Sequence, residues 1–249
     1  MGEEQGGGVG GFLKEAAIVV IGALILSTLL RLFLVQVFLI PSRSMEPTLA
    51  VGDRVAVQKV SGFTRGDIVV FRDDLEWLGN PDRFSQPIWK DVLTFVGLMP
   101  DESNNHLVKR LIGLEGDHVV CCDTEGRLTV NDAALEESAY LAVDPTTGRQ
   151  VKPSEHTFDL VVPAGRIFVM GDNRSNSADS RCHLAEDDGG VDHLGAFPST
   201  GSVVGVVAAT IFPFDRWRGF GAPDSFAEVP SASAPAPAEP VLSGTVPAC

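Results

Sequence analysis

Basic residues and cysteines are both scarce in this sequence of 249 residues. Lysine and arginine together number 19 against 33 aspartates and glutamates, which leaves a formal net charge of -14. Proteins that bind nucleic acid need a surplus of cations to neutralise phosphates, so we expect no nucleic-acid partner. Four cysteines are too few for a small scaffold that depends on disulfides.

Familiar hydrolase and metal-site motifs are also missing. The sequence contains no G-x-S-x-G nucleophile elbow and no H-E-x-x-H motif, and none of its five histidines lies in a recognisable triad context. The acidic group around Asp187 and His193 matches no metal-ligand spacing, so we interpret it as a solvated loop. We therefore predict no metal site.

Apolar runs of membrane-spanning length are limited to one, over residues 16–40, and only Arg31 and Gln36 interrupt it with strongly polar side chains. A helix that spans a bilayer needs about 20 apolar residues. A cleaved signal peptide has a shorter apolar region of about 7–15 residues and an A-x-A site after it, and neither feature is found here. We therefore predict an uncleaved transmembrane anchor over 16–40 that follows a leader over 1–15.

The rest of the chain divides into a domain and a tail. Residues 222–249 are rich in Ala, Pro and Ser and contain no cation, which predicts a disordered tail. Residues 41–221 remain as the folded domain. The leader has Lys14 against three glutamates, so its charges hardly define orientation. A single N-terminal anchor before a large domain is typical of a translocated domain, so we expect a cytoplasmic N-terminus and an extracytoplasmic domain in the cell membrane.

Short runs rich in β-branched and aromatic residues recur through the folded domain, each bounded by Gly, Pro, Asp or Asn. This pattern is typical of a mainly β domain of mostly antiparallel strands. We expect strands within residues 53–60, 67–71, 107–113, 118–122, 127–132, 157–162, 166–172 and 202–212. Two segments depart from the pattern. For residues 73–105 two interpretations stay open, a short amphipathic helix and a membrane-dipping loop. Residues 183–193 are predicted to form an acidic surface loop.

Two serines, Ser42 and Ser44, lie between Pro41 and Pro47 directly after the predicted anchor. The prolines stop a helix and restrict the backbone around both hydroxyls. A connecting loop is the simpler interpretation of this segment by itself. A nucleophilic serine would also need a base to take its proton.

Lysine is the remaining candidate base, and the sequence contains few lysines. In an extended strand Lys109 shares a face with Leu107 and Leu111, and desolvation there would lower its pKa. A lysine base must be neutral near pH 7, which requires a fall of roughly 3 units from about 10.4. Lys59 also lies on an apolar face and stays open as an alternative. For either lysine alone, a buried aliphatic stem with an exposed amine is the more common arrangement.

A dense polar segment over residues 171–181, GDNRSNSADSR, completes a set of four sequence blocks. The others are PSRSMEPTL, DIVVF and KRLIGLEGD, in that order along the chain. In this order the blocks resemble the bacterial type I signal peptidases, serine–lysine proteases of the membrane, and the resemblance covers residues 16–212 with gaps. No single block would be specific.

The resemblance implies a signal-peptidase-like antiparallel β catalytic domain behind a single transmembrane helix. It also implies a membrane-bound serine endopeptidase that removes N-terminal signal peptides from exported preproteins after small residues, at A-x-A type sites. The expected partners are therefore exported preproteins and the lipid bilayer, and no cofactor is expected.

By position, the resemblance makes Ser44 the nucleophile and Lys109 the general base, in preference to Lys59. It assigns the oxyanion hole to Ser42 and to the backbone N–H of Ser44. It also implies that Ser177 orients the lysine amine and that Asp179, with Arg174 and Arg181, braces the loop. The implied substrate pocket is lined by Ile40, Met45, Leu49 and Val108.

Some features depart from this pattern or leave alternatives open. Arg43 stands between the two serines, where many family members have a small residue. Cys121, Cys122 and Cys182 lie in a predicted exported region, where a disulfide is permitted and free thiols are equally open. Two other functions also stay open: a self-cleaving serine–lysine peptidase, and a non-catalytic membrane-anchored β module that binds exported polypeptides.

Overall fold

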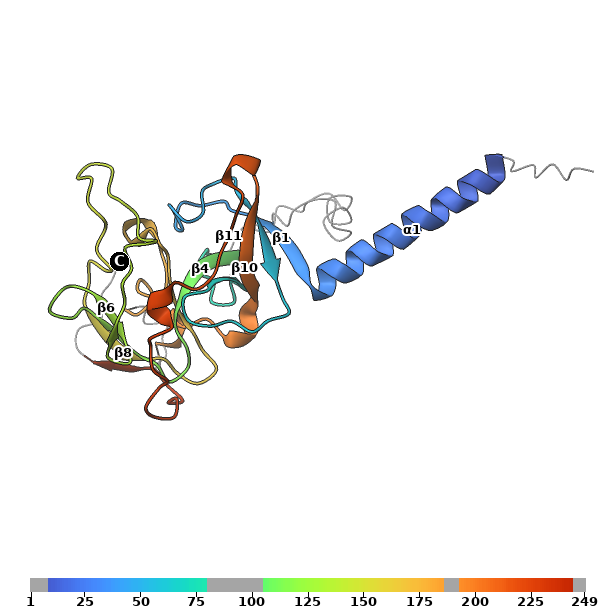
Figure 1. Ribbon diagram of the computed structural model, residues 1–249. Coiled ribbons are helices and arrows are strands. Elements are labelled where there is room, and N and C mark those ends of the chain that lie inside the picture. The colour runs from blue at the N-terminus through green and yellow to red at the C-terminus, as the bar shows by residue number, and fades with distance from the viewer. Residues whose placement is uncertain (1–8, 80–104, 186–192, 244–249) are drawn as a thin grey trace, which may run out of the picture.

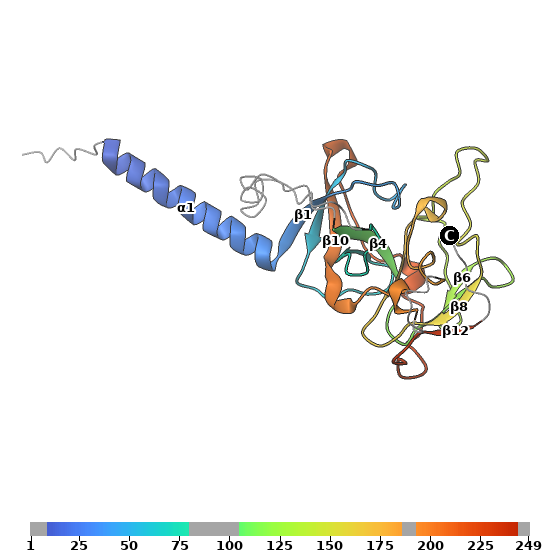
Figure 2. The same ribbon diagram turned by 180° about the vertical axis from the view of Figure 1, so that it is seen from behind.

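The computed structural model describes residues 9–79, 105–185 and 193–243. Most of residues 73–105, and most of the predicted acidic loop over 183–193, therefore lie outside the described residues. Their described flanks meet where the Trp77 and His183 rings stack with centroids 4.4 Å apart. Figures 1 and 2 show one long helix, α1 (Val9–Phe33), that projects away from a β-rich body.

Helix α1 contains a stretch, Gly10–Leu29, that is long and apolar enough to cross a membrane and is not buried against the body. The helix begins earlier and ends earlier than the predicted anchor over 16–40. Residues beyond it form strand β1 (Val35–Leu39), which pairs with β2 (Arg54–Gln58). The boundary at residue 40 was wrong, because the β-branched and aromatic residues of β1 belong to the edge of a sheet.

Two antiparallel sheets form the body, which confirms the predicted mainly β fold. The first sheet has the strand order β1, β2, β10, β3, β4, β9, and β11 pairs with β10. The second sheet has the order β12, β8, β5, β6, β7. The remaining strands are β3 (Ile68–Arg72), β4 (His106–Gly113), β5 (His118–Cys121), β6 (Leu128–Val130), β7 (Ala133–Ala134), β8 (Phe158–Val161), β9 (Phe168–Met170), β10 (Val203–Phe212), β11 (Arg218–Gly219) and β12 (Val241–Ser243).

Short 3₁₀ turns connect several of these strands. They are η1 (Arg174–Asn176), η2 (Leu194–Ala196), η3 (Thr200–Ser202), η4 (Phe214–Arg216) and η5 (Asp224–Phe226).

Each predicted run of β-branched residues contains a strand, whereas β1, β7, β11 and β12 were not predicted.

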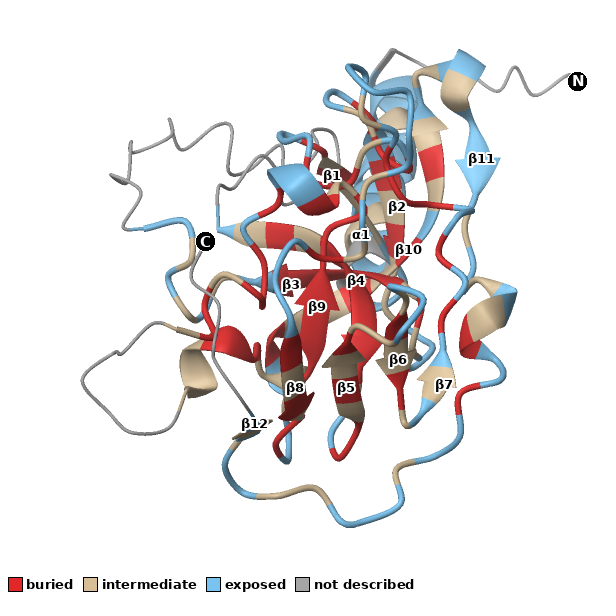
Figure 3. Ribbon diagram, turned by 90° about the vertical axis from the view of Figure 1, so that its left-hand side faces the viewer, coloured by how far each residue is buried: buried red, intermediate tan, exposed pale blue. Residues whose placement is uncertain are grey.

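Strands β3 and β9 and most of β4 are buried on both faces of the first sheet (Figure 3). On β3, Val69 packs in one apolar cluster and Val70 in another, because adjacent side chains of a strand point to opposite faces. A third and larger cluster includes Val119 and Leu160 of the second sheet together with Phe168 of β9. Strands β3, β4 and β9 are therefore held rigidly, which is what a site built on them requires.

The segment beyond β11 is ordered, although the sequence predicted a disordered tail over 222–249. Phe226 and Val229 are buried in the largest apolar cluster, and β12 pairs with β8. A segment with few apolar residues can order when those residues enter a core that already exists. The prediction of disorder is thus wrong for 222–243, and residues 244–249 lie outside the described part of the chain.

Candidate active site

The predicted nucleophile and base are in direct contact. Ser44 lies in the turn that follows β1, Lys109 lies in the middle of β4, and Lys109 Nζ donates a hydrogen bond to Ser44 Oγ at 2.8 Å. Both side chains are buried, with exposed fractions of 8% and 3%. The fold thus joins two positions 65 residues apart in the chain.

Burial lowers the pKa of Lys109 from 10.5 to about 8. Desolvation of the ammonium form is the largest cause, and Arg181 acts in the same direction. The negative charges of Asp179 and Asp172 oppose the shift. With this pKa, about one Lys109 in ten is neutral at pH 7, which is enough for a general base.

Lys59 occupies a different part of the first sheet. Its backbone N–H donates to Leu34 O at 2.9 Å, at the end of the β1–β2 pair next to α1. Ser44 follows the other end of this pair, where Leu39 is opposite Arg54. The geometry therefore favours Lys109 as the base.

Ser42, one of the two predicted oxyanion-hole residues, lies beside the nucleophile. Ser42 Oγ is 3.3 Å from Ser44 Oγ. Ser42 is exposed, whereas Ser44 is buried. A hydroxyl at this place can donate to charge that develops next to Ser44 Oγ. The role of Ser42 and of the Ser44 N–H stays a prediction.

The polar segment over 171–181 packs directly against the turn over residues 42–49, which contains Ser44 and which we call the nucleophile turn after the predicted role of that serine. The Asn173 N–H donates to Ser44 O at 3.0 Å, and Asn173 Nδ2 donates to Arg43 O at 3.2 Å. At Gly171 a Cβ atom would overlap both Ser44 O and Ser177 Oγ, so this close approach requires glycine. Ser177 is buried next to this contact, and its role in orienting Lys109 stays a prediction.

Asp179 and Arg181 form the predicted brace. Arg181 donates to both carboxylate oxygens of Asp179 at 2.9 and 2.8 Å, and the Gly171 N–H donates to Asp179 Oδ2 at 2.9 Å. Burial alone would raise the pKa of Asp179, but Arg181 and these hydrogen bonds outweigh it and lower the pKa below its usual value. Asp179 is therefore held as a carboxylate close to Lys109.

Arg174 holds the same segment from another side. Its Nε donates to Gly171 O at 2.9 Å, and its carbonyl oxygen accepts a hydrogen bond from Arg181 Nη2 at 2.9 Å. Its guanidinium also donates to Glu137, with the shorter contact at 2.5 Å, and to Pro153 O at 2.7 Å. Arg174 therefore connects the segment to the buried Glu137, while Arg181 occupies both oxygens of Asp179, and the role of Arg174 in the site stays a prediction.

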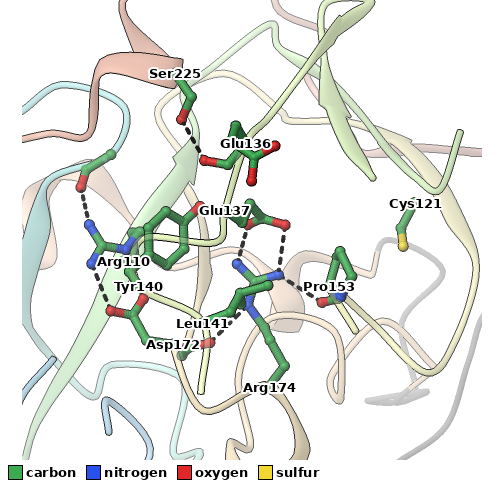
Figure 4. Close-up of polar contacts among 12 residues, drawn as sticks. Arg110, Cys121, Glu136, Glu137, Tyr140, Leu141, Pro153, Asp172, Arg174 and Ser225 are labelled. Atoms are coloured by element: carbon green, nitrogen blue, oxygen red, sulfur yellow. Dashed lines mark hydrogen bonds and ion pairs between the residues drawn. The ribbon is translucent and has the colours of Figure 1, made fainter. Parts of the chain in front are cut away.

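A further buried ion pair, between Arg110 and Asp172, was not predicted. Arg110 Nε and Nη2 donate to the two Asp172 oxygens at 2.7 and 2.6 Å, and Thr48 Oγ1 donates to Asp172 Oδ2 (Figure 4 shows the ion pair). Thr48 belongs to the nucleophile turn, so this pair connects that turn to β4 and to the end of β9. A usable signal existed, since an arginine in a buried strand needs a carboxylate partner.

Three of the predicted pocket residues, Ile40, Met45 and Leu49, are buried together in the apolar cluster next to the nucleophile turn. Val108 packs against that cluster and is partly exposed. The four residues therefore lie together, and their contact with a substrate stays a prediction. Cys121 forms a disulfide with Cys122 in the second sheet.

Comparisons with known proteins show the family to which this chain belongs. The model of the signal peptidase family, peptidase S26, matches residues 13–212. A probable signal peptidase I from Mycobacterium leprae is 36% identical and covers 86% of this chain and 81% of its own length. Signal peptidase I from Mycobacterium tuberculosis is 36% identical, with coverages of 82% and 74%. Signal peptidase I U from Bacillus subtilis is 33% identical, with coverages of 81% and 88%.

A solved signal peptidase I from Enterococcus faecalis aligns with 59% of this chain and 97% of its own at a TM-score of 0.37 and 24% identity. The family match and the relatives at 33 to 36% identity are decisive by themselves. This chain belongs to the signal peptidase family, peptidase S26, and is a serine endopeptidase.

Proposed function

We propose that this chain is a membrane-anchored signal peptidase I that cleaves exported preproteins with Ser44 as nucleophile and Lys109 as general base. The observation that carries the proposal is the buried contact of 2.8 Å between Lys109 Nζ and Ser44 Oγ. The lowered pKa of Lys109 supports it, because a lysine can accept a proton only when it is neutral.

The proposed reaction has two stages. Neutral Lys109 takes the proton of Ser44, and the serine oxygen attacks the scissile carbonyl. The Ser42 hydroxyl and the Ser44 N–H stabilise the negative charge on the tetrahedral intermediate. Protonated Lys109 then gives its proton to the leaving amine, and water, deprotonated by the neutral lysine, hydrolyses the acyl-enzyme.

The substrate is proposed to be the signal peptide of a preprotein, cut after small residues at an A-x-A type site. Ile40, Met45, Leu49 and Val108 supply an apolar surrounding for small side chains beside the nucleophile turn. The tether also supports this substrate. Only β1 separates Ser44 from α1, so a spanning α1 would hold the nucleophile near substrates that are themselves in the bilayer.

The proposed topology places α1 across the cell membrane, the N-terminus in the cytoplasm and the β-rich body outside. Protease added to intact spheroplasts would digest the body only if it lies on the outer side. Digestion that occurs only after the spheroplasts are lysed would reverse the proposed orientation.

A cleavage assay in detergent tests the proposed chemistry. Wild type, Ser44→Ala and Lys109→Ala are incubated with a preprotein that carries an A-x-A site. Ser175→Ala and Lys152→Ala are matched controls, because both side chains are exposed. We expect cleavage by wild type and controls and none by the two site variants.

Each other outcome points to a different conclusion. Cleavage by Ser44→Ala and Lys109→Ala at the wild-type rate would contradict the proposed dyad. A wild type that cleaves only its own chain would indicate a self-cleaving peptidase. A wild type that binds the preprotein without cleaving it would indicate a non-catalytic module.

A further inference from the structure

The segment after β11 lies outside the region that the signal peptidase family model matches, which ends at residue 212. We call residues 222–243 the C-terminal strap. It is attached at several places: Ser225 Oγ donates to Glu136 O at 3.1 Å, the Ala164 N–H donates to Pro237 O at 2.8 Å, and β12 pairs with β8 (Figure 4 shows the first contact). This is too many attachments for a solvated tail.

Phe226 is the one aromatic residue of the strap, and it is buried, with an exposed fraction of 5%. Its ring lies against Gly66, where an added Cβ would come within 2.7 Å of the ring. The same ring stacks near Tyr140, with centroids 6.4 Å apart and an interplanar angle of 28°. Phe226 therefore covers two residues that are far from it in the chain.

Both residues under Phe226 hold Arg110. The Tyr140 ring lies over the Arg110 guanidinium at 4.1 Å from its centroid, and Gly66 O accepts a hydrogen bond from Arg110 Nη1 at 2.7 Å. The third group that holds Arg110 is Asp172. Figure 4 shows Arg110 beside the Tyr140 ring, with its guanidinium in contact with the Asp172 carboxylate. The strap thus packs on two of the three groups that fix this arginine.

Arg110 and Asp172 both lie close to the proposed base. Arg110 follows Lys109 on β4, and the Asp172 charge acts on the Lys109 amine. Thr48 also connects Asp172 to the turn that contains Ser44. A displacement of Arg110 would therefore change both the field at Lys109 and the position of the nucleophile turn.

We propose that Phe226 of the C-terminal strap is a positioning residue, which holds Arg110 against Asp172 so that Lys109 and Ser44 stay aligned for proton transfer. This inference rests on the proposed function of the site. It adds a part of the chain that the family match does not include, and it gives the strap a role in the reaction besides stability.

The direction of the expected change follows from the charges around Lys109. Asp179 and Arg181 face it from the polar segment, Asp172 faces it from the end of β9, and Arg110 is its neighbour on β4. If Arg110 loosens, less positive charge offsets Asp172 and more water reaches the site. Both changes favour the ammonium form, so the pKa of Lys109 would rise.

The experiment compares wild type with Phe226→Ala in full-length, detergent-solubilised protein. We expect kcat at pH 7 to fall about tenfold with little change in KM, because alignment and not substrate binding is lost. We also expect the acid limb of the kcat/KM profile to move to higher pH by at least about half a unit. The ¹⁵Nζ resonance of Lys109, assigned with Lys109→Arg, gives its titration without relying on turnover.

Two further variants separate positioning from stability. Leu242→Ala removes a side chain from the same apolar cluster at the β12 end of the strap. Phe226→Leu keeps an apolar side chain over Gly66, so it tests the proposal even when Phe226→Ala does not fold. We expect an intermediate shift for Phe226→Leu and a wild-type acid limb and Lys109 titration for Leu242→Ala.

Folded Phe226 variants with a wild-type acid limb and titration would overturn the proposal, as would an equal shift in Leu242→Ala. These results would leave the proposed function intact as long as wild type cleaves and Ser44→Ala does not. A wild type without peptidase activity would instead contradict the proposed function, and the Lys109 titration would still decide whether Phe226 controls this amine.

Discussion

The two faces of β4 give two buried cations opposite environments. Lys109 and Arg110 are adjacent, and adjacent side chains of a strand point to opposite faces. Lys109 meets a neutral serine hydroxyl, and burial lowers its pKa to about 8. Arg110 is desolvated as well, but the bidentate contact with Asp172 outweighs burial and raises its pKa. Equal burial therefore lowers the pKa of the cation on one face and leaves a permanent cation on the other, and the hydrogen-bond partner makes the difference.

The largest effect is expected for Lys109→Arg, which places an arginine on the face of β4 that contacts Ser44 (the reactive face). Lys109→Arg keeps a positive charge but removes the base, since a guanidinium is not deprotonated in proteins. We expect kcat to fall by at least about 1,000-fold, as for the loss of a catalytic base in other serine peptidases. Single-turnover cleavage of a preprotein measures it. Activity within tenfold of wild type would mean that Lys109 is not the base.

A second prediction breaks the ion pair on the opposite face. Arg110→Met leaves Asp172 buried without its cation, so we expect the free energy of unfolding to fall by about 3–5 kcal/mol. Denaturant titration in detergent measures the change. The double variant Arg110→Met/Asp172→Leu should recover most of the loss, because it removes the unpaired charge. A double variant as unstable as the single one would show that packing and not charge dominates here.

Substitution by methionine on the reactive face should change the free energy of unfolding in the opposite direction. Lys109→Met removes an amine whose burial is unfavourable, so we expect the free energy of unfolding at pH 7 to rise by about 2 kcal/mol. The gain should shrink above pH 8. Between about pH 8 and 10.5 the unfolded chain binds more protons than the folded one, so the Lys109 contribution to stability rises with pH there. A destabilised Lys109→Met would contradict this comparison.

A last prediction concerns the pH dependence of wild type, without any substitution. Because the base must be neutral, kcat/KM should rise about tenfold per pH unit on the acid side and level off above the lowered pKa of about 8. Initial rates of preprotein cleavage across pH 6 to 10 measure it. A flat profile would indicate that Lys109 does not titrate in this reaction.

Much of the fold could be predicted from local patterns. Runs such as Ile68–Arg72 and Val203–Phe212 are rich in β-branched residues and became strands, as expected. The pattern failed at β1, where an apolar helix continues directly into an apolar strand and periodicity cannot separate them. It also failed at Phe226, because composition describes a segment and not the core into which its few apolar residues can pack.

The sequence by itself determined a mainly β domain behind one long apolar helix, and its motifs predicted Ser44 and Lys109 as the reactive pair. It left open whether either lysine is buried, since a strand pattern alone cannot show what covers a face. Only the tertiary structure decided that Lys109 meets Ser44 while Arg110 meets Asp172, a partner 62 residues away. The physical reason is that a pKa depends on solvent and on nearby charge, and both are set by residues that the chain brings together only when it folds.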